Sequence, residues 1–221
     1  MINSDTADHL LLDLHTHHPV PQPEAIVSLD PAQLPAEGAY PGQVYSAGIH
    51  PWTLAGLSIP ADRLSALRQA VMRQDVVAVG ETGIDTVHPG CVTMAGQLNA
   101  FRQHIGLSEE VGKPLVIHCV KGQDIIAGVR RDMRPRQAWA IHGFRGKPTV
   151  MRMFADLGIY VSFGIRFNSD SLLQIPAHLI LAETDETSGR IEDVIGALNA
   201  VRPDITPELL HANLLRFLTP L

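Results

Sequence analysis

The chain has 221 residues, a mass of 24.0 kDa and a formal net charge of −6, with 45% hydrophobic and 18% charged residues. This size and composition predict a single globular domain over residues 1–221. The negative charge and the lack of a basic run exclude a protein that coats nucleic acids. A metal-dependent enzyme acting on phosphodiesters is not excluded, because its ions carry the positive charge.

The sequence has two cysteines, no secretion signal and no apolar stretch near the roughly 18 residues that a membrane span needs. These features predict a reduced, cytoplasmic protein that does not enter the membrane. Nothing in the sequence indicates an obligate protein partner.

Eight short apolar runs along the chain predict buried strands. The runs are nearly continuous in apolar residues and together are rich in valine, isoleucine and leucine, as in parallel strands that are covered on both faces. The expected strands are residues 10–14, 25–29, 45–49, 76–80, 114–117, 138–141, 159–163 and 179–182.

Segments with helical periodicity separate several of these strands. In the segment 62–73, for example, Leu64, Leu67 and Val71 fall on one face of a helix. The expected helices are residues 62–73, 97–111, 149–157, 191–201 and 207–218, with shorter ones at 123–131 and 168–175. Alternating strands and helices predict an α/β fold, and eight strands indicate a TIM-type (β/α) barrel.

The first part of the barrel departs from this pattern. Six prolines occur between His18 and Pro41, and each removes a backbone donor and clashes with the preceding helical turn. We therefore expect a proline-rich loop in place of the first helix. The chain is also shorter than the roughly 250 residues typical of the fold, which predicts a compact or distorted barrel.

Histidines and acids at the ends of the expected strands are the candidate functional residues. His15 and His17 follow the first run, and side chains two residues apart on a strand face the same side, so both imidazoles can bind one ion. Four further ligand-type residues close later runs, namely Glu81, His118, His142 and Asp185. In a parallel barrel all these ends lie on one face, so we expect the side chains to converge.

Six short motifs carry a resemblance to a known family. They are DLHTH at 13–17, GIHP at 48–51, GETGID at 80–85, IHC at 117–119, HGF at 142–144 and ETD at 183–185. In order and approximate spacing they resemble the signature motifs of the TatD family of metal-dependent hydrolases. The resemblance implies a barrel hydrolase with one or two divalent ions, and most known members act as nucleases or phosphodiesterases.

The resemblance also implies roles for individual residues. His15, His17, Glu81 and Asp185 would hold the first ion, and Glu81 would bridge to a second ion held by His118 and His142. Asp185 is the expected acceptor of a proton from water, so Asp185 and Glu81 are the candidate catalytic residues. Mixed imidazole and carboxylate ligands suit Zn, Mn or Mg without selecting one of them. His50 matches a histidine near the substrate phosphate in relatives.

The substrate side of the site departs from the family. Lys121 and Arg190 are the remaining candidate cations for a phosphate, and residues 86–89 replace an aromatic side chain that would stack on a base. The segment 143–146 is a candidate phosphate cradle built from backbone N–H groups. Glu183 is a candidate for orienting a ligand histidine. The loops around the predicted metal site are thus shortened and carry fewer substrate-binding groups than those of the family.

The expected function is hydrolysis of phosphodiester bonds by metal-activated water, with a nucleic-acid end or a small phosphodiester as the substrate. Two alternatives stay open. One is an amidohydrolase-like or PHP-like hydrolase of a small substrate, since DLHTH also opens PHP phosphoesterases. The other is a catalytically silent metal-binding barrel.

Overall fold

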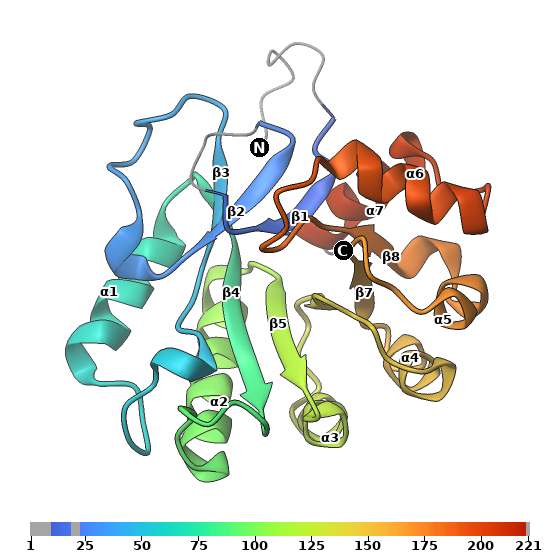
Figure 1. The fold of residues 1–221 in the computed structure, drawn as a ribbon. Coiled ribbons are helices and arrows are strands. Elements are labelled where there is room, and N and C mark those ends of the chain that lie inside the picture. Colours follow the sequence, from blue (N-terminus) through green and yellow to red (C-terminus); the bar gives the residue numbers. More distant parts are fainter. Residues whose placement is uncertain (1–9, 19–22, 220–221) are drawn as a thin grey trace.

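The computed structural model describes residues 10–18 and 23–219, and its eight parallel strands close into a barrel in chain order (Figure 1). The strands are β1 (Asp13–Thr16), β2 (Ala25–Leu29), β3 (Val44–Ala47), β4 (Val76–Asp85), β5 (Leu115–Val120), β6 (Trp139–Ile141), β7 (Tyr160–Phe163) and β8 (Ile180–Ala182). Pairing of Asp13 with Ala182 joins β1 to β8 and closes the ring. The TIM-type barrel predicted from the sequence is therefore confirmed.

Helices lie outside the barrel, as the sequence periodicity predicts (Figure 1). They are α1 (Ala61–Met72), α2 (Met94–Val111), α3 (Gln123–Met133), α4 (Pro148–Ala155), α5 (Ser169–Gln174), α6 (Ile191–Val201) and α7 (Pro207–Leu218). Capping residues fix both ends of α2. The Thr93 side chain accepts from Gly96 N–H at the start, and Gly112 takes the left-handed conformation at the C-cap. None of the helices among the described residues has the length and apolarity needed to cross a membrane.

The proline-rich segment forms no α-helix in its described part. Between β2 and β3 the only helical turn is the 3-10 turn η1 (Pro31–Gln33), where the Asp30 side chain accepts from Ala32 N–H at 3.0 Å. Two further 3-10 turns are η2 (Pro51–Thr53) and η3 (Ala177–Leu179). The expected loop is thus observed between β2 and β3, whereas residues 19–22 lie outside the described part of the chain.

The barrel is irregular, with register shifts where β1 meets β2 and on both edges of β4. The sequence prediction ended the fourth strand at residue 80, and this boundary is wrong. β4 continues to Asp85 because β5 stays paired with it, matching Thr82 to Ile117 and Asp85 to Val120. Glu81 therefore lies inside the strand rather than after it.

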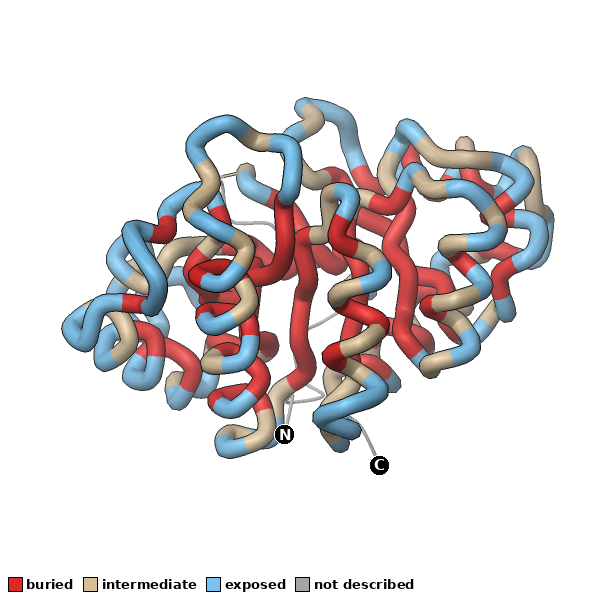
Figure 2. Tube along the Cα trace, turned by 90° about the horizontal axis from the view of Figure 1, so that it is seen from below, coloured by how far each residue is buried: buried red, intermediate tan, exposed pale blue. Residues whose placement is uncertain are grey.

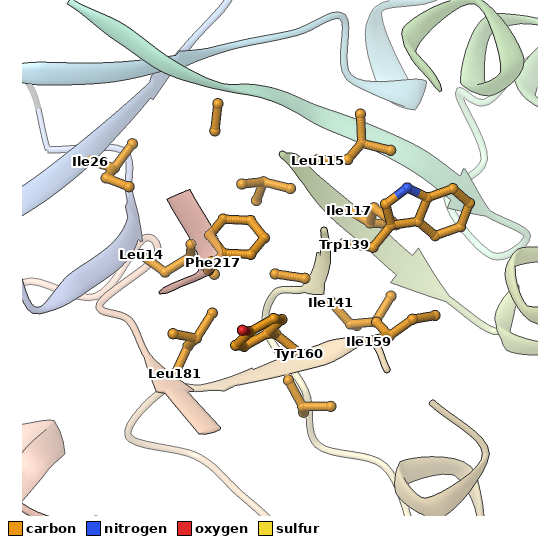
Figure 3. Packing of buried hydrophobic residues seen from close by; sticks show 14 of the residues in the cluster. Leu14, Ile26, Leu115, Ile117, Trp139, Ile141, Ile159, Tyr160, Leu181 and Phe217 are labelled. Carbon is orange, nitrogen blue, oxygen red and sulfur yellow. The ribbon is translucent and has the colours of Figure 1, made fainter. Parts of the chain in front are cut away.

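The buried residues form one core that fills the barrel and the layer beneath the helices (Figures 2 and 3). Phe217 of α7 lies among the core side chains, with its ring centroid 5.5 Å from that of Tyr160 at the start of β7. Asn213 of the same helix donates to the carbonyl oxygens of Ala177 and Ile180 just before and at the start of β8. Helix α7 thus covers the end of the barrel where the strands begin, which leaves the opposite end open for a site.

One buried histidine fastens the loop after β3. His104 on α2 is fully buried, its Nδ1–H donates to Ala100 O at 2.8 Å, and its Nε2 accepts from Ile49 N–H at 3.0 Å. Burial lowers the pKa of His104 to about 4 from the ordinary 6.5. The neutral imidazole therefore fixes the backbone next to His50.

This histidine predicts a pH dependence of stability. Between about pH 6.5 and about pH 4 the unfolded chain binds a proton at His104 that the native protein does not, so the free energy of unfolding falls as the pH falls, by up to about 3 kcal/mol. Above that window the contribution is constant. Urea unfolding at about pH 7 and about pH 4.5 measures it, with His104→Gln as the non-titrating comparison. Equal pH slopes in the two proteins would contradict this assignment.

Candidate metal centre

The six predicted metal-ligand residues meet at the carboxyl end of the barrel. His15 and Glu81 lie within β1 and β4, and His118 lies within β5. His17, His142 and Asp185 directly follow or lie close behind β1, β6 and β8. Side chains up to 170 positions apart in the chain therefore meet at one end of the barrel, since parallel strands place all their carboxyl ends on the same side.

The first cluster gathers around Oε2 of Glu81. The Nε2 atoms of His15 and His17 lie 3.1 Å from each other and 3.3 Å from Glu81 Oε2. Oδ1 of Asp185 lies 3.8 Å from the first of these nitrogens and 3.9 Å from the second. Two imidazole nitrogens and two carboxylate oxygens thus face a common point, the donor set of a small divalent ion.

The second cluster gathers around the other oxygen of the same carboxylate. Glu81 Oε1 lies 2.9 Å from His118 Nδ1, 2.6 Å from His142 Nε2 and 3.1 Å from His50 Nε2. One carboxylate therefore turns one oxygen toward each cluster, which is the arrangement of a bridging ligand between two ions. His50, which the sequence placed near the substrate, lies in direct contact with the Glu81 carboxylate.

Close backbone packing explains how Glu81 reaches this position. A Cβ at Gly48 would lie 2.5 Å from the carbonyl oxygen of Glu81, so only glycine lets the end of β3 approach β4 there. Gly83, with φ +148°, passes the backbone of His118 so closely that a Cβ would lie 2.0 Å from its carbonyl oxygen. These two glycines bring β3, β4 and β5 together around the carboxylate.

Electrostatics show that the site needs positive charge. Glu81 is buried, which raises the pKa of its carboxyl, but His142, His15 and His118 outweigh burial and hold the pKa well below 4.5. Burial lowers the pKa of His142, but the carboxylates of Glu81, Glu183 and Asp185 outweigh it and raise the pKa to about 9. The carboxylates therefore draw a cation to this point, and a divalent ion fits where a proton would otherwise sit.

The imidazole of His15 is ready to act as a ligand. Burial is the largest influence and lowers the pKa of His15 to about 4. The ring is thus neutral at physiological pH, the form that binds metals. Together with the ionised Glu81, it gives a donor set that fits a divalent cation.

Two buried acids support the ligands from behind. Asp13 accepts from the N–H groups of His15 and Thr184 at 3.0 and 3.2 Å and from the Thr184 hydroxyl at 2.6 Å. Burial raises the pKa of Asp13 to about 7. Glu183 accepts from Gly143 N–H, and its Oε1 lies 3.9 Å from Nδ1 of His142. Asp13 thus ties β1 to the segment carrying Asp185, and Glu183 faces a ligand histidine as expected from the sequence.

Asp85 is a supporting residue to which the sequence analysis gave no role. Its Oδ2 lies 3.2 Å from Nε2 of His118 and accepts from Trp52 Nε1–H at 2.7 Å. Its Oδ1 accepts from Val87 and His88 N–H groups at 2.8 and 2.9 Å. Burial raises the pKa of Asp85, but these donors outweigh burial and hold it far below its ordinary range. The sequence feature that could have pointed to Asp85 is its position as the acid that ends the GETGID motif.

We expect Asp85→Ala to weaken metal binding by roughly 10- to 100-fold, because the carboxylate fixes the tautomer and orientation of His118. Asp85→Asn keeps an acceptor oxygen and should recover most of the affinity. Titration of the metal-free protein with Mn or Zn measures the effect. Unchanged affinity in the alanine variant would show that His118 needs no support from Asp85.

An aromatic stack borders the site, although the sequence departs from the family's aromatic position there. The ring of Trp52 is 44% exposed and lies parallel to that of His88, with centroids 4.1 Å apart at 16°. His88, in the segment 86–89, thus stacks on Trp52, which follows β3.

The cavity over the metal cluster has a volume of about 260 Å³. Besides ligand residues, its lining includes Ser28, Asp30, Gln33, Trp52 and Glu186, and in the described part of the chain no lysine or arginine lines it. Lys121 is exposed beyond β5, and exposed Arg190 pairs with Glu192 at 3.0 Å. The structure does not bring these two predicted substrate cations into the cavity.

A parallel barrel with two clusters of histidines and acids around one carboxylate at its carboxyl end is the arrangement found in the class of metal-dependent barrel hydrolases. Within that class the chain belongs to the TatD family, because the TatD related DNase family matches residues 30–188. This confirms the family resemblance seen in the motifs.

Individual relatives agree with this placement. The chain is 29% identical over 150 residues to the uncharacterized metal-dependent hydrolase YcfH of Escherichia coli. It is 31% identical over 150 residues to the 3'-5' ssDNA/RNA exonuclease TatD of Pantoea ananatis. These matches cover 64% and 63% of this chain but only 55% and 56% of the relatives, so the chain spans about half their length.

The fold is shared with a solved structure of the family. The TatD homologue YjjV of Escherichia coli superposes with a TM-score of 0.76 at 20% identity. The superposition covers 99% of this chain and 98% of the other. Both chains therefore form the same barrel.

Proposed function

We propose that the chain hydrolyses phosphodiester bonds, with one or two divalent ions of the Zn, Mn or Mg type and a nucleic-acid end or a small phosphodiester as the substrate. The observation that carries this proposal is the Glu81 carboxylate, with one oxygen toward His15 and His17 and the other toward His118 and His142. The name of the Pantoea ananatis relative, a 3'-5' ssDNA/RNA exonuclease, supports the substrate class.

In this function His15, His17, Glu81 and Asp185 would hold one ion, and Glu81, His118 and His142 the other. A bound pair of such ions lowers the pKa of a water molecule and stabilises charge on the attacking and leaving oxygens. Asp185 is partly exposed and lines the cavity, so its carboxylate can accept the water proton at the side where substrate enters. His50 also lines the cavity; its Nδ1 accepts from Trp52 N–H, so a phosphate oxygen would compete with Glu81 Oε1 for the donor at Nε2.

A substrate panel tests the proposal. The protein is reconstituted separately with Mn, Mg and Zn and assayed on bis(p-nitrophenyl) phosphate, single-stranded DNA, and small amide and ester substrates. We expect turnover of the phosphodiesters. Hydrolysis of only the amide or ester would favour the amidohydrolase-like alternative, and bound metal without any turnover would favour a silent barrel.

We expect the double variant His15→Ala/His17→Ala to lose about one equivalent of bound metal, because both imidazoles face the same point near Glu81 Oε2. Elemental analysis of the reconstituted protein gives the stoichiometry. His178→Ala is a control, since this histidine lies on η3, outside the cluster. Unchanged stoichiometry in the double variant would remove the pair from the site.

A further inference from the structure

A second cavity lies beside the metal cluster. It has a volume of about 550 Å³ and is lined by the segments that follow β6, β7 and β8. Asp185 and Glu186 line both this cavity and the one over the metal cluster, so the two adjoin at the candidate catalytic acid. In Figure 1 these segments lie on the side of the barrel carrying α4, α5 and α6. We call the second cavity the lateral groove.

Two arginines give the lateral groove its cationic character. Arg145 follows β6 and Arg166 follows β7, and both are exposed and line the groove. Neither forms an ion pair or hydrogen bond with another residue in the part of the chain that the structure describes. By contrast, Arg63 and Arg73 each pair with an aspartate at 2.6 and 2.7 Å. Two unpaired guanidinium groups in one groove favour an anionic ligand.

The acids of the groove do not cancel this preference. Glu183 is buried and already accepts from Gly143 N–H, and Asp185 belongs to the metal cluster. Glu186 remains as an exposed acid at the boundary of the two cavities. Two of the three acids, Glu183 and Asp185, thus already have partners within the site. The two arginines are left to attract an anion.

The backbone of the segment 143–146 does not form the cradle that the sequence suggested at its start. Gly143 N–H donates to Glu183, and Phe144 N–H donates to the carbonyl oxygen of Ser162 at 3.1 Å. Neither N–H group is free for a phosphate. The Arg145 side chain is the charged group that this segment offers a ligand.

We propose that Arg145 and Arg166 bind a phosphate of a nucleic-acid strand next to the phosphodiester that is cleaved. This inference rests on the proposed function and narrows its substrate class. The cavity over the metal cluster has no lysine or arginine in its described lining, so cationic side chains for a phosphate are found only in the adjoining lateral groove, where a neighbouring phosphate reaches the arginines. The preferred substrate is then a strand with at least one phosphate beyond the scissile one.

Binding by the metal-free protein tests the inference without catalysis. Anisotropy of a fluorescent single-stranded oligodeoxynucleotide, in chelator, gives the Kd at several salt concentrations for the wild type, the double variant Arg145→Ala/Arg166→Ala and Arg136→Ala. Arg136 is an equally charged control on the segment before β6, at the opposite end of the barrel. We expect the slope of log Kd against log salt to fall by about 0.7 per lost phosphate contact in the double variant only.

Kinetics of the metal-loaded protein give a second readout. For the oligonucleotide we expect the KM of the double variant to rise by at least about tenfold with kcat retained, since charged hydrogen bonds to phosphate are lost in the bound substrate. Both constants for bis(p-nitrophenyl) phosphate should stay unchanged, because that substrate has no second phosphate.

The outcomes separate the two proposals. Equal salt slopes in the wild type and double variant, an equal loss in Arg136→Ala, or no oligonucleotide binding by the wild type would each overturn the role of the lateral groove. Failure of the loaded wild type to cleave either phosphodiester would instead overturn the proposed function, whatever the binding data show.

Discussion

Glu81→Gln is expected to lower kcat/KM on a phosphodiester by at least about 10³-fold, an effect of roughly 4 kcal/mol on the activation barrier. The side chain keeps its size but loses its charge, and one of its two oxygens becomes an N–H donor. Nitrogens of His15, His17, His118 and His142 lie within 3.3 Å of the two oxygens, so neither cluster keeps its shared carboxylate. The variant should also bind less metal.

The measurement pairs kcat/KM at saturating metal with the metal content of the same sample. Near-ultraviolet circular dichroism serves as the control for folding, since the buried amide fits the same space. A variant that kept two equivalents of metal and more than about a tenth of the wild-type rate would show that Glu81 does not bridge the clusters.

The strands that carry the ligands could be predicted because their apolar runs are continuous and end in a histidine. The runs before His118 and His142 are PLVI and AWAI, with no charged residue, and β5 and β6 lie within a few residues of the predicted positions. A parallel barrel then requires that residues at their carboxyl ends share one face. Convergence of the six predicted ligand residues follows from topology and needs no knowledge of side-chain geometry.

The length of β4 could not be predicted in the same way. Residues 81–85 are mostly polar or glycine, and a polar segment after an apolar run normally indicates a loop. The segment continues as a strand because β5 supplies its backbone partners and because the polar side chains face the metal cluster and its support. Here the tertiary environment decides what the local pattern leaves open.

Residues that are not themselves candidate metal ligands were the hardest to identify from the sequence. The role of Asp85 depends on contacts with Trp52 and His118, which lie 33 positions away in either direction. The position of Arg145 relative to Arg166 depends on how the segments after β6 and β7 meet at the lateral groove. No periodicity links such residues, so no pattern in the sequence points to them.

Asp185→Asn is expected to lower kcat by about 10³-fold or more while the fold is retained. The amide can no longer accept a proton from water, and it offers a weaker ligand to the cluster formed with His15 and His17. Asparagine is the appropriate substitute because residue 185 has φ 55°, in the left-handed region that asparagine tolerates and alanine does not.

The two functions of Asp185 can be separated in this variant, because a missing ligand and a missing base respond differently to added metal. Activity lost with the ligand alone would be restored by excess Mn, whereas loss of the base would leave kcat low at every metal concentration. We expect the second result, since Asp185 Oδ1 lies 3.8 and 3.9 Å from the imidazole nitrogens, farther than Glu81 Oε2 at 3.3 Å. A near-native rate would exclude Asp185 as the base, and full rescue by metal would reduce its role to that of a ligand.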